Sequence, residues 1–83
     1  MKKHEWREKT DEGEVRLVTA TRHAGKWKLQ SRLKSEMEWT QFNPIPLDDL
    51  ESLREIIWNK YQRSRVPHSH VLEIDQLIAN RKN

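Results

Sequence analysis

The sequence contains no cysteine, and only two of its 83 residues are glycine. Without cysteine the chain cannot form a disulfide, a thiolate metal site or a thiol nucleophile, and this composition is typical of a reducing compartment. Two glycines are too few for a glycine-rich phosphate loop, and no nucleophile motif is present. We therefore expect no enzyme activity, no catalytic residue and no cofactor.

The chain also lacks a long apolar run. The lysines that follow Met1 lead into polar and charged residues, so we expect neither a secretory signal nor a membrane-spanning segment, and a cytoplasmic protein with no membrane partner. A chain of this length suits one domain with a modest core. Because such cores seldom supply more than about 3–5 kcal/mol, we expect the tryptophans to provide much of the burial, or the chain to form a homodimer.

One stretch has no acidic residue. The chain has 13 Asp and Glu, but none lies between Val15 and Lys34, where six bases occur. These bases are Arg16, Arg22, Lys26, Lys28, Arg32 and Lys34. A segregated cationic stretch of this kind indicates a surface for a polyanionic partner.

Hydrophobic alternation predicts that this stretch is a β-hairpin. Residues 26–34 alternate strictly between Trp, Leu or Ser and basic or amide side chains, which is the period of a half-buried strand. Residues 15–22 are rich in β-branched side chains. We predict a three-residue loop, His23–Gly25, that ends in a left-handed glycine. This loop pairs Arg22 with Lys26 and places all six bases on one face.

A further strand is predicted on each side of the hairpin. Residues 6–10 precede a turn that contains Gly13, and a two- or four-residue loop is expected to place Thr10 opposite Val15. This register sends Trp6 to the core and Arg7 and Lys9 to the basic face.

After the hairpin, residues 35–37 form a weaker turn, for which we choose an odd loop length. With this choice Trp39 joins Trp6 and Trp27 as core packing residues, whereas Phe42 lies on the open face.

Two helices are predicted after the sheet. The prolines in residues 43–47 cannot donate to a ladder, so the sheet ends there. Asp48 is expected to cap a helix over about residues 48–62, which has an apolar stripe at helical spacing. Pro67 begins a second amphipathic segment over about residues 67–80.

Together these elements predict a single α+β domain over residues 1–83. Its four-stranded antiparallel meander sheet spans about residues 4–42, and the two C-terminal helices pack on one face of that sheet. The opposite face is expected to be open and cationic.

An open basic sheet face is suited to nucleic acid, because lysine and arginine neutralise phosphates and a flat sheet accepts an extended strand or stacked bases. We predict a binding domain for single-stranded DNA or RNA with little sequence specificity. The candidate binding residues are Arg7, Lys9, Arg16, Arg22, Lys26, Lys28, Arg32 and Lys34.

Other interpretations compete with this one. Basic residues on the solvent side of a small sheet also resist aggregation without any ligand. A protein-interaction module is the alternative function, because the acidic start of the first helix or a sheet edge is suited to a protein partner. His68 and His70, with Glu73 one turn beyond, lack a third ligand of fixed geometry, so we expect no metal site.

The order of these features resembles a known family. Residues 25–32 read Gly-Lys-Trp-Lys-Leu-Gln-Ser-Arg, and after a linker come Ile45, Pro46, Leu47, Leu50 and Leu53. This order, over about residues 15–57, is similar to the single-strand-binding transcriptional coactivators of the positive-cofactor-four type. The resemblance implies a curved antiparallel sheet before a helix, dimerisation through that helix, and backbone contacts to single-stranded DNA from Lys26, Lys28 and Arg32. The chain departs from that family after Arg32, where Leu33 and Lys34 replace an acid and an aromatic, and in its second helix.

Overall fold

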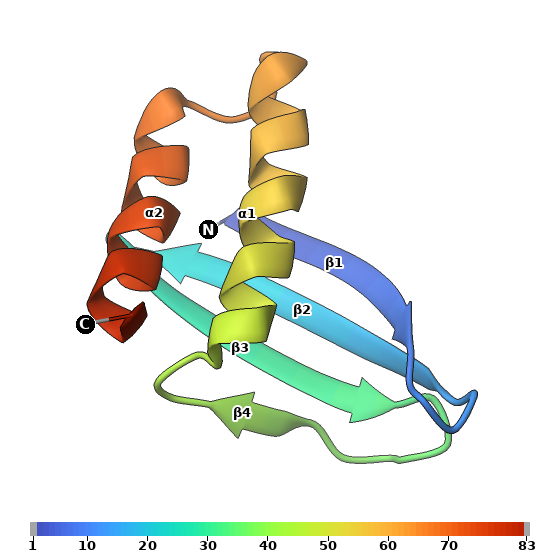
Figure 1. The fold of residues 1–83 in the computed structure, drawn as a ribbon. Coiled ribbons are helices and arrows are strands. Elements are labelled where there is room, and N and C mark those ends of the chain that lie inside the picture. Colours follow the sequence, from blue (N-terminus) through green and yellow to red (C-terminus); the bar gives the residue numbers. More distant parts are fainter. Residues whose placement is uncertain (1, 83) are drawn as a thin grey trace. The chain divides into compact units, whose positions relative to one another are not determined.

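A computed structural model describes the backbone of residues 2–82 and the side chains of residues 3–81. Four antiparallel strands form one sheet in chain order and are followed by two helices (Figure 1). The strands are β1 (Lys2–Lys9), β2 (Val15–His23), β3 (Lys26–Leu33) and β4 (Thr40–Phe42). The predicted α+β meander with two C-terminal helices is confirmed.

The chain divides into two compact units, Met1–Pro44 and Ile45–Asn83, and the division falls within the predicted proline linker. The first unit is the sheet and the second is a pair of helices. The packing of these helices on a sheet face stays a prediction.

The β2–β3 hairpin has a two-residue loop, so the predicted three-residue loop is wrong. Ala24 and Gly25 both have positive φ angles, 53° and 77°, as a type I′ turn requires. His23 consequently pairs with Lys26, one residue away from the predicted register. The prediction failed because only glycine was expected to adopt a left-handed conformation, whereas here an alanine adopts it as well.

The β1–β2 hairpin has a three-residue loop that ends at Gly13, whose φ is 85°. The amide of Gly13 donates to the carbonyl of Thr10 at 2.9 Å, and the amide of Thr10 donates to the carbonyl of Glu14 at 2.8 Å. Lys9 therefore pairs with Val15, where Thr10 was expected. This register is also shifted by one residue.

Both shifts act on β2 and turn its side chains to the opposite faces. Paired residues of an antiparallel sheet project on the same side. One side, the buried face, contains Val18 and Ala20 of β2 with Leu29 of β3, each at most 1% exposed. The other side, the exposed face, contains the lysines of β3 and Leu17, together with Thr19, which its neighbours cover to 4% exposure. The predicted common face of six bases is therefore wrong.

The short strand β4 also differs from its predicted register. Phe42 pairs with Leu29 and lies on the buried face, whereas it was expected on the open one. Trp39, which was expected in the core, is 40% exposed. The turn before β4 has no glycine to set its length, and the loop has an even number of residues where an odd number was predicted. Trp6 and Trp27 lie on the buried face as predicted.

The second unit contains α1 (Leu47–Gln62) and α2 (His68–Lys82), which pack side by side. The predicted apolar stripes are buried, with Leu50, Leu53 and Ile57 on α1 and Val71 and Ile74 on α2. The guanidinium of Arg54 pairs with the carboxylate of Asp75 across the two helices. None of the helices described in residues 2–82 is long and apolar enough to cross a bilayer.

The start of α1 differs from the prediction that Asp48 caps the helix. Pro46 occupies the N-cap position and no side chain caps the helix there, so Asp48 is not the cap. Asp48 and Asp49 instead lie in the first turn, where carboxylates interact favourably with the helix dipole.

Candidate nucleic-acid interface

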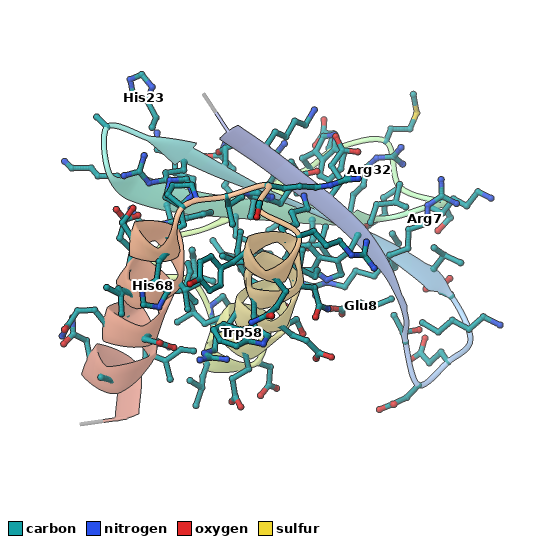
Figure 2. The ribbon with its side chains drawn as sticks, turned by 90° about the horizontal axis from the view of Figure 1, so that it is seen from above. Arg7, Glu8, His23, Arg32, Trp58 and His68 are labelled. Carbon is teal, nitrogen blue, oxygen red and sulfur yellow. The ribbon has the colours of Figure 1, made fainter. Side chains whose placement is uncertain are left out.

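The exposed face of the sheet has its bases in rows that run across the strands. Arg7 of β1 pairs with Leu17 of β2, which pairs with Arg32 of β3. Side chains of paired residues are neighbours on one face, so these three form one row. Figure 2 shows Arg7 and Arg32 on the same side of the sheet, with Glu8 on the other.

A second basic row lies four residues further along the strands, roughly 14 Å from the first. It contains Lys3 and Lys28, which both pair with Thr21. Lys26, paired with His23, extends this basic area toward the end of the hairpin, and Lys9 extends the first row at the other end.

The row between these two has no base. It consists of Glu5, Thr19, Gln30 and Gln41, which pair in succession across all four strands. The carboxylate of Glu5 accepts an ion pair from Nζ of Lys3 at 3.0 Å, and both side chains are well exposed. The exposed face therefore has two cationic rows on either side of a mainly neutral centre.

Arg32 has a fixed position on this face. Its Nη1 donates to the carbonyl of Glu36 at 2.7 Å and, more weakly, to those of Leu33 and Lys34 at 3.4 Å. The side chain of Glu36 in turn accepts from the amide of Leu33 at 2.8 Å. The oxygens that accept from Arg32 all belong to the main chain of the β3–β4 loop, so the guanidinium stabilises this loop. Because main-chain carbonyls carry no formal charge, they do not neutralise the guanidinium.

An open groove of about 520 Å³ crosses the exposed face. Arg7 and Arg32 line it together with Thr19 and Gln30, and Trp39 forms part of its wall. The guanidinium of Arg32 lies 5.2 Å from the centroid of the Trp39 ring, a cation–π distance.

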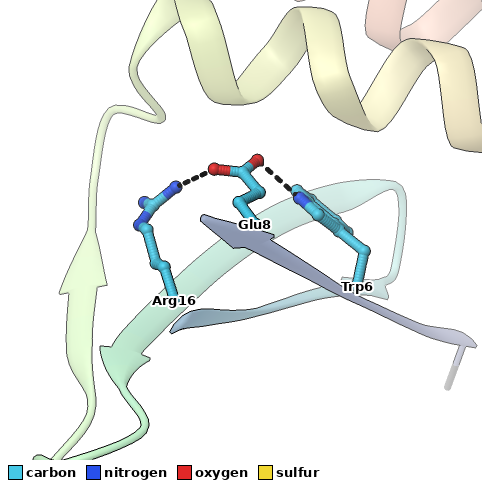
Figure 3. A network of polar contacts seen from close by, with 3 residues as sticks. All are labelled: Trp6, Glu8 and Arg16. Atoms are coloured by element: carbon cyan, nitrogen blue, oxygen red, sulfur yellow. Dashed lines mark hydrogen bonds and ion pairs between the residues drawn. The ribbon is translucent and has the colours of Figure 1, made fainter. Parts of the chain in front are cut away.

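Two predicted binding residues, Arg16 and Arg22, lie on the buried face because β2 is turned over. Arg16 donates to Oε2 of Glu8 at 3.1 Å, and Oε1 of the same carboxylate accepts from the indole of Trp6 at 2.7 Å (Figure 3). The guanidinium also lies 5.8 Å from the ring centroid of Phe42. Arg16 is therefore part of a half-buried structural network.

Lys34 lies just beyond the end of β3. Its amide donates to the carbonyl of Val15 at 2.8 Å, and it borders a shallow hollow of about 300 Å³ with Glu14 and Ser35. It thus extends the exposed face at the Lys9 end. Of the eight predicted residues, the structure places six on or beside one face.

Sequence reasoning missed two residues of this face, Lys3 and Trp39. The alternation of residues 3–9, with Lys3, Glu5 and Arg7 on one side, would have found Lys3 if the first strand had been started earlier. No comparable signal was available for Trp39, because it precedes β4 in an irregular loop.

Within residues 2–82 no group of His, Asp and Glu could hold a metal ion. A second set of bases, Lys60, Arg63 and Arg65, lies at the connection between the helices. Burial, and to a smaller extent the charge of Arg65, lowers the pKa of Lys60.

No protein-family model, curated protein or solved structure matches this chain significantly.

Proposed function

We propose that the exposed face binds the sugar–phosphate backbone of single-stranded DNA or RNA. The observation that carries this proposal is the pair of basic rows on β1 and β3, with Glu5 as the one acid among the strand residues described on that face. Lysine and arginine in such an arrangement neutralise phosphates and release counterions.

The shape of the face supports a single strand over a duplex. Reading a duplex groove requires a protruding helix or β-ribbon, whereas this face is a sheet with an open groove and an exposed aromatic ring. Contacts to phosphates position a nucleic acid and carry little information on its bases, so the sequence preference is slight.

The salt dependence follows from the number of bases. If Lys3, Arg7, Lys9, Lys26, Lys28 and Arg32 each contact one phosphate, the logarithm of the affinity falls with the logarithm of salt concentration with a slope of about −4.

The test is a titration of labelled single-stranded DNA, RNA and duplex DNA of equal length at two salt concentrations. Lys26→Glu with Lys28→Glu should weaken single-strand binding about 100-fold and flatten the salt slope. Arg32 is left unchanged because it closes the β3–β4 loop. The control is Arg63→Glu with Arg65→Glu, which changes the net charge equally but lies in the helical unit.

The proposal requires the control to stay within about threefold of the wild type and circular dichroism to show both variants folded. Equal losses in both double variants would reduce the effect to net charge, and an unchanged affinity in the sheet variant would refute the assigned surface.

One observation favours the alternative, a protein-interaction module. A hollow of about 460 Å³ on the helical unit combines Glu51 and Glu55 with Trp58, a pattern suited to a basic protein segment or to self-association through opposite charge. Absence of nucleic-acid binding below about 10⁻⁴ M would favour this alternative.

A further inference from the structure

The groove on the exposed face has a planar aromatic wall. Trp39 is 40% exposed although the guanidinium of Arg32 lies over its ring at 5.2 Å from the centroid. Most tryptophans bury their rings in a core, whereas this ring is partly exposed and contacts a cation. An exposed indole ring can stack with a planar group of a ligand.

Arg32 holds this ring in position. Three main-chain carbonyls between Leu33 and Glu36 accept from its Nη1, so the guanidinium is fixed to the loop that leads to Trp39. The cation–π contact favours one orientation of the ring before a ligand arrives, and this preference lowers the entropic cost of stacking on it.

A polar group lies in the same groove. Gln30 lines it together with Trp39, and its side chain ends in an amide. An amide offers both a donor and an acceptor, which matches the edges of nucleobases. The groove volume of about 520 Å³ falls within the range of about 300–1,000 Å³ that is common for small-molecule sites.

We infer that this groove takes one unpaired nucleobase, which stacks on Trp39 and places its edge near Gln30. The inference rests on the proposed function and adds to it a base-binding subsite between the two basic rows. Phosphates on either side of that base lie toward Arg7 and Lys28. A base paired within a duplex cannot enter, because both of its faces are already stacked.

The experiment compares two single-stranded probes of equal length and charge, oligothymidylate and an abasic oligonucleotide. Wild-type protein should bind oligothymidylate about tenfold more tightly, as expected for one base stacked on an aromatic ring. Trp39→Leu keeps apolar bulk but loses the planar ring, so it should bring the affinity for oligothymidylate down to that for the abasic probe. Trp39→Phe should retain part of the preference.

The outcomes separate this inference from the function on which it rests. Binding of neither probe overturns the proposed function. Equal binding of both probes by the wild type leaves phosphate binding intact and overturns the base subsite, and this comparison needs no variant to fold. A Trp39→Leu protein that is folded by circular dichroism but loses equal affinity for both probes also overturns it.

Discussion

On the buried face of the sheet, the side chain of Arg16 is 20% exposed and forms an ion pair with Glu8. On the exposed face, the side chain of Arg32 donates instead to main-chain carbonyls. Both arginines belong to the same acid-free stretch of sequence. On one face the charge is cancelled by a carboxylate within the sheet, and on the other it is retained. For these two arginines, the partner that the protein itself provides therefore decides whether the charge can serve a ligand.

The largest expected difference between the faces is in packing. Leu29→Ala removes a side chain that is 1% exposed on the buried face and should lower the free energy of unfolding by about 3 kcal/mol. Leu17→Ala, on the exposed face, is the matched change and should cost about 1 kcal/mol, because its side chain is only half-buried. Urea denaturation measures both, and equal losses would contradict the assignment of the two faces.

A smaller difference is expected between two carboxylates of β1. Glu8→Ala leaves the indole of Trp6 and the guanidinium of Arg16 without this acceptor and should destabilise the protein by about 2 kcal/mol. Glu5→Ala breaks an exposed pair with Lys3 and should cost less than about 0.5 kcal/mol. If thermal unfolding gave the larger loss for Glu5→Ala, the structural role of the buried-face network would be wrong.

The smallest effect tests the register that separates the faces. Ala24→Asn should raise the free energy of unfolding by about 0.5–1 kcal/mol, because asparagine tolerates the positive φ of a type I′ turn better than alanine. For a domain of this size that is a rise in Tm of about 2–8 °C. Gly25→Ala is the control, since it is destabilising in either loop. A three-residue loop would give no gain from Ala24→Asn.

The sequence predicted the elements well and the faces only in part. Strict alternation in residues 26–34 and two helical stripes identified most of the fold. In β2 the pattern was ambiguous, because Val15 and Leu17 are as apolar as Val18 and Ala20. The orientation of β2 therefore depended on the two loops that flank it, and each loop was misjudged by one residue.

Those two errors affected the candidate site unequally. They moved Arg16 and Arg22 to the buried face, but Arg7 stayed on the same face as the bases of β3. The register of β2 is shifted by one residue against both β1 and β3, so the two shifts cancel between these outer strands. Trp39 could not be placed from sequence, since no glycine or proline sets the length of the turn before it.

The strand β4 is only three residues long and pairs with Leu29–Ser31 of the much longer β3. Within the described residues, the first part of β3 therefore forms a border of the sheet to which a foreign strand could attach. Lys26 and Lys28 flank Trp27 on this border, and the hydration of their ammonium groups opposes such an addition. Either sign of charge at these positions protects against fibrillar growth, whereas neutral side chains there would leave the protein prone to aggregation.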